Sequence, residues 1–272
     1  MSLNEGGTKN NRVKKDRSIL LTFDVEEFDL PLEYGIALPA KEQMKTGIKG
    51  LEIIKNLLSL NKISSTLFTT ANFASQFPDE VRDLAKEHEI ASHTFYHSSY
   101  RDEDLRNSRL TLEEIISKKI YGIRIPRMKK IDTSLIRLAG YEYDSSVHPT
   151  WIPGRYNNLD KPRSRYEENG IIELPASVSP FLRIPLFWLA FKNFPYAYYK
   201  KLVLGCLKKD GYVCLYFHPW EFTDLTLYKL PLIIKRMSGD VLKNRLQKLI
   251  TDLKEQGDFM TMHSFLSPSH VS

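Results

Sequence analysis

Residues 18–27 read Ser-Ile-Leu-Leu-Thr-Phe-Asp-Val-Glu-Glu, an apolar run that ends in acidic side chains. We interpret Ser18 to Asp24 as a buried strand, because short apolar runs of this kind fill the middle of parallel sheets. Asp24 and Glu26 are two positions apart, so on an extended chain they point to one face while Val25 points away. One carboxylate could bind a metal ion while the other accepts a proton from water. The alternative is a solvated acidic loop.

Strand-like runs alternate with amphipathic helical segments along the rest of the chain. The predicted strands are residues 18–24, 65–69, 89–92, 121–125, 141–144, 171–174, 211–217 and 259–262. The predicted helices are residues 47–60, 79–88, 105–120, 132–139, 196–207 and 241–256. Residues 145–168 are rich in Pro, Gly, Asn and Arg and have no periodicity, so they predict an irregular insertion, which we extend to about residue 195. Strands that alternate with helices predict parallel βαβ units, and hence an α/β barrel or a doubly wound sheet.

The composition indicates one large domain. The chain has 272 residues, of which 42% are hydrophobic, enough for a substantial core. We expect residues 18–265 to form this domain, with a polar tail at 1–17 that is neither signal peptide nor membrane anchor, and a second tail at 266–272. No apolar run is long enough to span a bilayer, so we expect a cytoplasmic protein without stable membrane insertion. The sequence gives no basis for an oligomeric state.

The charge pattern argues against a nucleic-acid-binding protein, and the cysteines argue against a disulfide-rich one. The net charge of +6 is scattered over lysine pairs and forms no basic stripe with interleaved aromatic residues. We therefore expect no nucleic-acid partner, although contact with anionic polymers or membrane surfaces is compatible with this charge. Cys206 and Cys214 have apolar neighbours, so we expect small core residues and no disulfide framework.

The segment Ser92 to His97, Ser-His-Thr-Phe-Tyr-His, carries two histidines four positions apart. Side chains at this spacing share one face of a helical turn, so His93 and His97 can direct their ring nitrogens at one point. Two imidazoles and one carboxylate leave a coordination position open, as in catalytic zinc sites. The alternative is a pair of solvated or core histidines. The motif H-E-x-x-H is absent, because Thr94 occupies the position of its glutamate, and a metalloprotease is not indicated. His263 also follows a predicted strand and is a reserve candidate.

Further polar side chains fall at or just beyond the ends of predicted strands, where parallel α/β folds carry their active sites. Arg124 can hold a carboxylate through two hydrogen bonds, although an ordinary ion pair is the alternative. His218 suits general acid catalysis near neutral pH. Asp144 is the last residue of the predicted strand 141–144, so it would lie at the same edge of the sheet. Trp151 and Trp220 could line a sugar pocket, although tryptophan is more often a core residue.

Together these segments resemble a known family. Five ordered segments carry the resemblance: Thr-Phe-Asp-Val-Glu-Glu (22–27), Ser-His-Thr-Phe-Tyr-His (92–97), Arg-Ile-Pro (124–126), Tyr-Asp-Ser-Ser (143–146) and Leu-Tyr-Phe-His-Pro-Trp-Glu (215–221). They resemble the motifs of the NodB-homology polysaccharide deacetylases, carbohydrate esterase family four, and most of all the branch with D-x-E in the first motif and H-P-W-E in the last. The resemblance spans residues 18–265. It implies a distorted (β/α)7 barrel that binds one divalent metal ion and hydrolyses acetyl groups on a glycan.

Carried over position by position, the resemblance assigns roles to five residues. Asp24 would be the general base, and Arg124 would orient it. His218 would be the general acid that protonates the leaving amine. His93 and His97 would be metal ligands, and the expected ion is zinc, with cobalt or nickel as alternatives.

Two positions depart from the family pattern. The second aspartate of the first motif is Val25 here, so the third metal ligand is expected to be Glu26, or else Glu27. The residue after the proline of the third motif is usually aromatic and is Arg127 here. Its backbone N–H could still stabilise an oxyanion, but the side chain changes the shape and charge of the pocket. The expected substrate-binding residues are Arg127, Asp144, Trp151 and Trp220.

We therefore expect a metal-dependent enzyme that removes acetyl groups, N-acetyl before O-acetyl, from a bacterial polysaccharide or glycan. Two alternatives stay open: an amidohydrolase of a small linear or cyclic amide in the same fold, and a glycan-binding barrel without turnover, which Val25 motivates.

The most aromatic stretch, Phe181 to Tyr199, is interrupted by two prolines and cannot form one long helix. We expect it to pack in the core as an irregular crossover. The alternative is an aromatic patch beside the pocket that makes peripheral membrane contact, with Arg183 and Lys192 near anionic headgroups.

Overall fold

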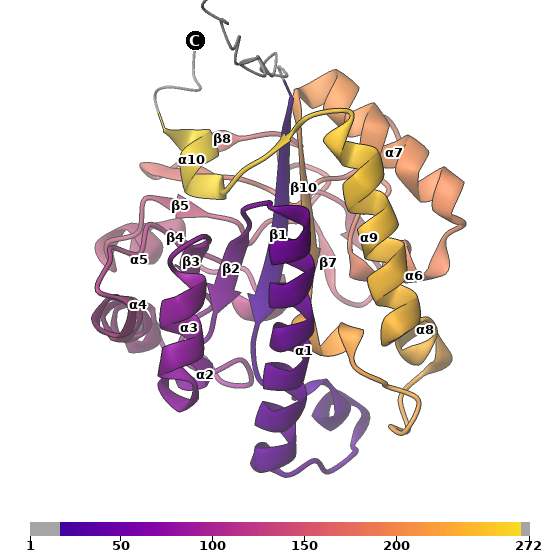
Figure 1. The fold of residues 1–272 in the computed structure, drawn as a ribbon. Helices are drawn as coiled ribbons and strands as arrows, with labels where there is room; N and C mark the ends of the chain where they lie inside the picture. The colour runs from indigo at the N-terminus through magenta and orange to yellow at the C-terminus, as the bar shows by residue number, and fades with distance from the viewer. Residues whose placement is uncertain (1–16, 268–272) are drawn as a thin grey trace, which may run out of the picture.

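A curled sheet of mainly parallel strands forms the centre of the molecule, and helices cover its outer side (Figure 1). The computed structural model describes residues 17–267, so the tails predicted at the two ends fall almost entirely outside the described residues. The strands of the main sheet, in sheet order, are β10 (Tyr212–Phe217), β1 (Ser18–Val25), β2 (Thr66–Thr69), β3 (Glu89–Ser92), β4 (Gly122–Ile123), β5 (Tyr143–Asp144), β9 (Ile171–Glu173) and β8 (Tyr166–Glu168), with β11 (Asp258–Phe259) beside β1.

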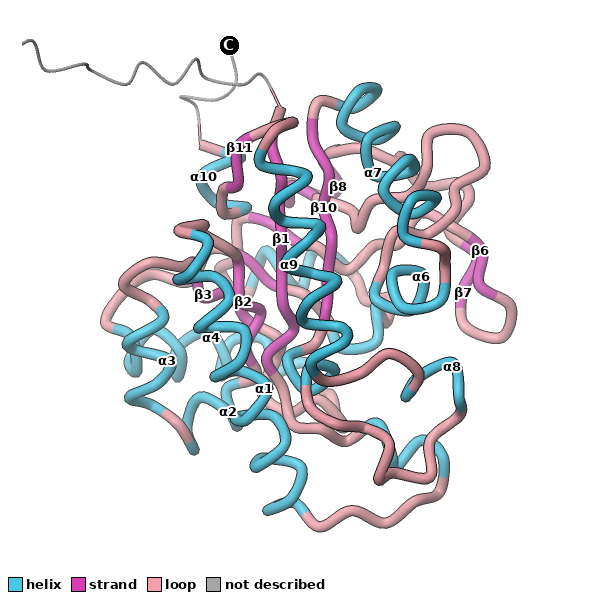
Figure 2. Tube along the Cα trace, turned by 45° about the vertical axis from the view of Figure 1, so that its right-hand side comes forward, coloured by secondary structure: helices cyan, strands magenta, loops and turns pink. Residues whose placement is uncertain are grey.

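The helices follow the strands in alternation, and Figure 2 shows α1 and α9 on the same side of β1 and β10. The α-helices are α1 (Ala40–Asn61), α2 (Ala71–Gln76), α3 (Pro78–Leu84), α4 (Asp102–Ile116), α5 (Thr133–Leu138), α6 (Trp188–Asn193), α7 (Tyr196–Asp210), α8 (Leu232–Lys235), α9 (Asp240–Lys254) and α10 (Met262–Leu266). Short 3-10 helices are η1 (Leu30–Tyr34), η2 (Pro126–Met128) and η3 (Pro219–Phe222).

The sheet closes into a distorted barrel. The strands from β10 through β5 to β9 pair in parallel. Between β9 and β10 an irregular segment takes the place of direct strand pairing: the backbone N–H of Ser177 donates to the carbonyl of Cys214 at 2.9 Å, and the Ser177 hydroxyl accepts from the Cys214 N–H at 2.8 Å. The predicted fold class, a distorted α/β barrel, is confirmed.

Side chains of β1 alternate between two apolar environments. Four of them pack outward against the helices: Ile19, Leu21, Phe23 and Val25. Leu20 faces the barrel interior, where it belongs to the same cluster as Phe68 and Cys214. Because alternate residues of a strand point to opposite faces, Thr22 and Asp24 share the face of Leu20 and point into the barrel.

The register of the sheet brings the polar strand ends together. One row of paired residues crosses the strands near their carboxyl ends: Val25, Thr69, Ser92, Ile123 and Asp144. Glu26, His93 and Arg124 each follow a member of this row, and therefore lie at one edge of the sheet. His218 follows Phe217, the partner of Phe23, at the end of β10.

Several predicted elements need correction. The insertion is not wholly irregular, because β6 (Trp151–Ile152) and β7 (Tyr156–Asn157) form an antiparallel hairpin. The closing strand ends at Phe259, and α10 begins at Met262 because the side chain of Thr261 accepts a hydrogen bond from Ser264 and caps the helix. Helix α1 begins at Ala40, well before the predicted start.

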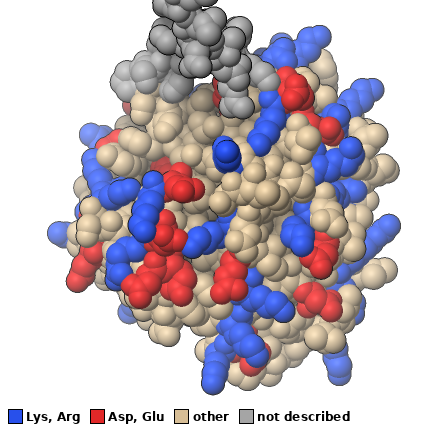
Figure 3. Space-filling model, in the orientation of Figure 1, with Lys and Arg blue, Asp and Glu red and all other residues tan. Residues whose placement is uncertain are grey.

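The surface and the cysteines agree with the composition. On the face shown in Figure 3, basic and acidic side chains are interspersed and no stripe of one sign is visible. Cys206 and Cys214 are buried and free. Among residues 17–267 no helix is both long enough and apolar enough to span a bilayer.

Helix α1 approaches the η3 segment so closely that only glycine fits at position 50. A Cβ atom added at Gly50 would overlap the backbone carbonyl of Pro219, in the turn that follows His218. We expect Gly50→Ala to lower the free energy of unfolding by about 1–3 kcal/mol, as overpacking does. Urea unfolding measures this change.

Gly205→Ala in helix α7 is the matched control. An added Cβ there has no neighbour closer than 3.8 Å, so the change should be neutral or stabilise the helix by up to about 1 kcal/mol. Equal effects of the two substitutions would contradict the close packing of α1 on η3.

Candidate metal centre

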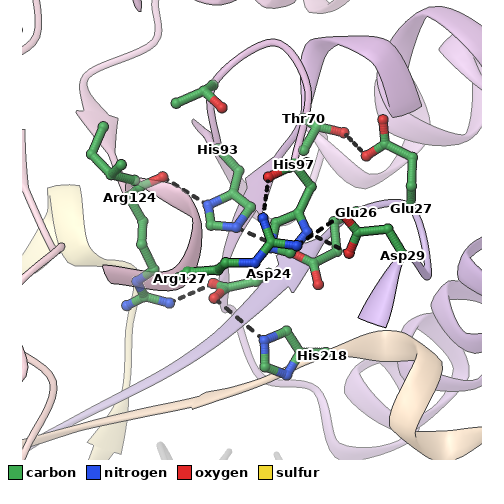
Figure 4. Close-up of polar contacts among 12 residues, drawn as sticks. Asp24, Glu26, Glu27, Asp29, Thr70, His93, His97, Arg124, Arg127 and His218 are labelled. Carbon is green, nitrogen blue, oxygen red and sulfur yellow. Dashed lines mark hydrogen bonds and ion pairs between the residues drawn. The ribbon is translucent and has the colours of Figure 1, made fainter. Parts of the chain in front are cut away.

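A cavity of about 130 Å³ opens at the carboxyl ends of β1, β3 and β10. It is lined by most of the site residues predicted from the sequence: Asp24, Glu26, His93, His97, Arg124, Arg127, His218 and Trp220. Most of these side chains are buried, and Figure 4 shows how all of them except Trp220 converge. The strand ends therefore supply one common site.

Three of these residues direct donor atoms at one point. Nε2 of His93 and Nε2 of His97 each lie 3.1 Å from Oε2 of Glu26. Among residues 17–267 these three form the one group of His, Cys, Asp or Glu side chains whose ligand atoms lie within 4.8 Å of one another. Two imidazole nitrogens and a carboxylate oxygen are the ligand set of catalytic zinc sites, so the residues present fit a divalent ion.

The opposite ring nitrogens of both histidines are held by hydrogen bonds. Nδ1 of His93 donates to the backbone carbonyl of Arg124 at 2.7 Å, and Nδ1 of His97 donates to Oδ1 of Asp29 at 2.7 Å. An imidazole that donates from Nδ1 carries its lone pair on Nε2 once that atom has lost its proton, so both rings can present a ligand nitrogen to a cation beside Glu26. Asp29 is fixed in turn by Arg127, whose Nη2 lies 3.1 Å from Oδ2.

The histidines lie in a loop and not in the helical turn that their spacing predicted. The chain after β3 has no helix before Asp102, and Thr94 has a left-handed backbone with φ of 62°. Backbone N–H groups at the start of α2, on Ala71 and Asn72, donate to the carbonyls of Thr94 and Phe95 at 3.0 and 2.9 Å. The loop is thus shaped by α2, a long-range contact that the spacing of the histidines could not reveal.

Asp24 and His218 face each other beside the three donor residues. Nη1 of Arg124 donates to Oδ1 of Asp24 at 2.6 Å, while Oδ2 lies 3.9 Å from Nε2 of His218. Arg124 is fully buried, and its guanidinium also bonds Thr22 and Ser145. One oxygen of Asp24 is therefore held, and the other points toward His218.

His218 is in turn held by a buried ion pair. Nδ1 of His218 lies 3.1 Å from Oε1 of Glu221, and the second oxygen of Glu221 lies 3.1 Å from Nζ of Lys192. Burial by itself lowers the pKa of His218, but the bond to Glu221 and the charges of Glu26 and Asp24 raise it above the usual value. This arrangement favours the protonated imidazole.

The charged groups around Glu26 also shift the pKa values of Glu26 and His97. Burial by itself raises the pKa of Glu26, but the charges of His97 and His218 outweigh burial and hold it far below its usual range. Burial by itself lowers the pKa of His97, yet Glu26 and Asp29 raise it to about 9. Glu26 is therefore anionic, and an incoming cation has to displace a proton from His97.

The neighbours of Glu26 point elsewhere. Glu27 accepts hydrogen bonds from Thr70 at 2.8 Å and from Asn72, away from the histidines (Figure 4). Val25 packs in the core against the helices. Of the two acids proposed as third ligand, only Glu26 therefore reaches the histidines.

The four predicted substrate-binding residues lie at different distances from this centre. Trp220 is buried, donates from Nε1 to Glu26 at 3.0 Å, and stacks on His218. Trp151 is 60% exposed on the β6–β7 hairpin and does not line the cavity. Asp144 lines a separate cavity with Glu173, where burial raises its pKa to about 6.

Arg127 lines the cavity, but its guanidinium is occupied by protein groups. It bonds Asp29, Glu33 and the carbonyl of His97. The side chain therefore braces the loop that carries His97. The reserve candidate His263 lies elsewhere, stacked on Tyr121 with a centroid distance of 3.6 Å.

The sequence did not predict the parts that Asp29, Glu221 and Lys192 play in this site. Asp29 and Glu221 each follow a selected residue by three positions, so their proximity to Glu26 and His218 was a usable signal. No local sequence signal pointed to Lys192, because it comes from a distant helix. Its exposed fraction of 1% excludes the suggested contact with lipid headgroups.

The aromatic stretch that includes Lys192 divides between surface and cavity. Phe181 is 92% exposed, whereas Phe187 and Trp188 are half-buried and line the cavity. Trp188 packs edge-on against His218 with a centroid distance of 5.3 Å. The expected core packing therefore holds only in part, and an aromatic wall stands beside the pocket.

Comparisons with known proteins identify the family. Residues 11–144 match the family described as polysaccharide deacetylase, and residues 145–267 match a domain of unknown function, DUF3473. Because β9 and β10 belong to the same sheet as β1, the second match covers the other half of one barrel. A search of curated proteins found no match.

Solved structures show the same fold at low sequence identity. A chain from Mycobacterium smegmatis described as a polysaccharide deacetylase has a TM-score of 0.62 and 19% identity, over 97% of this chain and 93% of its own. Puue allantoinase has a TM-score of 0.62 and 16% identity, over 93% and 90%. A chain from Pseudomonas aeruginosa PAO1, also described as a polysaccharide deacetylase, has a TM-score of 0.61 and 14% identity, over 95% and 94%. Residues 11–144 therefore form a domain of the polysaccharide deacetylase family, the NodB-homology carbon–nitrogen hydrolases, and the rest of the chain completes its barrel.

Proposed function

We propose that this protein removes N-acetyl groups from a glycan with the help of one divalent metal ion, zinc before cobalt or nickel. Glu26, His93 and His97 would hold the ion. Their convergence on one point, beside the facing pair of Asp24 and His218, carries the proposal. A divalent ion bound there would polarise the acetyl carbonyl and lower the pKa of a water molecule.

Asp24 is the proposed general base. Arg124 holds its Oδ1 by a hydrogen bond, so Oδ2 is free to accept a proton from the attacking water. A base in this position contributes about 10²- to 10⁴-fold to the rate.

His218 is the proposed general acid. Its Nδ1 is bonded to Glu221, so the proton on Nε2 faces the cavity and can pass to the nitrogen of the departing sugar amine. Trp188 and Trp220 enclose the ring and keep it out of bulk water. The raised pKa of His218 supports this role, because the acid has to be protonated before the C–N bond breaks.

The cavity continues past Arg127 into a groove of about 510 Å³. An extended groove suits a polymer better than a small amide. No observation favours the small-amide hydrolase, and the likeness to an allantoinase is one of fold.

Metal removal and addition test the proposal. Protein treated with chelator should lose acetate release from N-acetylated oligosaccharides, and zinc, cobalt or nickel should restore it. Acetate release is measured by an enzyme-coupled assay and metal content by elemental analysis. Stoichiometric metal without acetate release from any N-acetylated glycan would contradict deacetylation, and full activity of metal-free protein would contradict the role of the ion.

Glu221→Gln tests the acid. A neutral amide stabilises the imidazolium less than a carboxylate does, so the pKa of His218 should fall. The acid is active below its pKa and is lost as pH rises through it, so the alkaline limb of the pH–rate profile should move to lower pH. Metal content and the thermal melt separate this effect from damage to the fold. An unmoved alkaline limb would contradict the assignment of His218.

A further inference from the structure

The groove beside the catalytic cavity has a charge of its own. It begins at residues shared with that cavity, among them Arg127 and Arg155, and extends along the segment that follows η2. Apart from His97, every charged side chain that lines it within residues 17–267 is a cation: Arg127, Lys129, Lys130 and Arg155. No carboxylate in this part of the chain contributes to its lining.

Neighbouring acids neutralise only part of this charge. Arg127 pairs with Asp29 and Glu33, and Arg155 lies 3.4 Å from the same Glu33. Lys129 and Lys130 are exposed, and within the described chain neither lies in ion-pair distance of a carboxylate. Four cations therefore meet two carboxylates, and the groove is left with a positive excess.

The backbone that positions these cations is strained. Arg127 and Met128 both have left-handed backbone conformations, with φ of 59° and 53°, which residues other than glycine rarely adopt. Such strain persists where surrounding contacts fix it, and it gathers at functional sites. Here the turn directs Arg127 onto Asp29 and Glu33, and the two lysines follow directly along the groove.

The groove also offers surfaces for sugar rings. Tyr100 and Tyr156 line it, and Nζ of Lys129 lies 5.1 Å from the ring centroid of Tyr100. Aromatic rings pack against the apolar faces of sugars, and a cation beside them can meet an acidic substituent. The groove therefore places aromatic rings beside a positive charge.

We propose that the substrate is an anionic glycan, whose carboxylate or phosphate groups lie in this groove beside Lys129, Lys130 and Arg155. An acetylated sugar of the same chain then occupies the cavity at Glu26 and the histidines. This inference rests on the proposed deacetylation but concerns a different part of the substrate.

The test compares Lys129→Gln/Lys130→Gln with Lys208→Gln/Lys209→Gln. The second pair is also exposed and removes the same charge, but it lies at the end of α7 and lines no part of the groove. Each metal-loaded protein is given three N-acetylated oligosaccharides of equal length: a neutral chito-oligosaccharide, one with alternating glucuronate, and one linked by phosphodiesters. Vesicles of phosphatidylcholine and phosphatidylglycerol are the fourth ligand. Binding is measured by calorimetry and acetate release by coupled assay, at low and high salt.

Wild-type protein and the α7 variant should bind one or both anionic oligosaccharides more tightly than the neutral one. The groove variant should lose about threefold to tenfold in affinity for the anionic ones alone, and high salt should remove the difference. The arm with the larger loss identifies carboxylate or phosphate as the natural group.

Three results would overturn the inference: equal binding of neutral and anionic oligosaccharides, equal losses in the two double variants, or a loss in the groove variant confined to anionic lipid vesicles. The last would assign the lysines to a membrane surface. If an anionic oligosaccharide binds through Lys129 and Lys130 but no substrate releases acetate, the inference stands and the proposed deacetylation fails.

Discussion

His93→Ala should yield a protein that retains no stoichiometric metal and releases no acetate. Nε2 of His93 is one of three donors that converge on a point, and its opposite nitrogen is fixed by the carbonyl of Arg124. Removing a residue that merely supports a ligand typically costs 10- to 100-fold in metal affinity or activity, so loss of the ligand itself should cost more. Elemental analysis and acetate release measure the two effects.

The matched control is His263→Ala. His263 lies in α10, and its ring stacks on Tyr121, outside the cavity. Its substitution should leave metal content and acetate release near the wild-type level. Wild-type acetate release by metal-free His93→Ala protein would reject the metal-dependent mechanism, whatever the control shows.

The residues that could be predicted from sequence are those fixed by strand register. Asp24, His93 and Arg124 follow or end apolar runs, and parallel pairing places such positions on one edge whatever the loops do. The alternation of strand and helix therefore predicted a parallel α/β fold and the edge at which the site is built, whereas the choice of a barrel came from the family resemblance.

The residues that could not be predicted are those fixed by loops and by distant helices. The spacing of His93 and His97 suggested a helical turn, but α2 shapes their loop through bonds to Thr94 and Phe95. Lys192 reaches Glu221 only because α6 packs close to β10 and α8. Such contacts join residues far apart in the chain, and no local pattern records them.

The departure at Val25 shows how the two kinds of information combine. Sequence alone left Glu26 and Glu27 as candidates for the third ligand. The structure bonds Glu27 to Thr70 and Asn72 and leaves Glu26 facing the histidines. Trp220, from the last motif, donates to the second oxygen of Glu26, so Oε2 is oriented toward both rings. The structure therefore favours Glu26 over Glu27 as the proposed third ligand.

Asp24→Asn should retain the metal ion and lose about 10²- to 10⁴-fold in kcat. The amide oxygen can still accept from Arg124, so the local geometry should persist, but the NH₂ group in place of Oδ2 cannot accept a proton from water. Asp24 itself is not among the three converging donors, so metal content should stay at the wild-type level. A thermal melt is needed beside the kinetics, because Arg124 loses its charged partner inside the barrel.

Glu27→Gln is the control that separates general base catalysis from the loss of any buried carboxylate near the site. Glu27 is buried, lies three positions further along the same segment, and points away from the cavity to Thr70 and Asn72. Its amide can keep a hydrogen bond to Thr70, so kcat should change by no more than a few fold. If Glu27→Gln lowered kcat as much as Asp24→Asn, or if Asp24→Asn lost its metal, Asp24 would not be the base. The opposite pattern, a metal-loaded Asp24→Asn protein that still binds the glycan and turns it over hundreds of times more slowly, is the one that the geometry of Arg124, Asp24 and His218 leads us to expect.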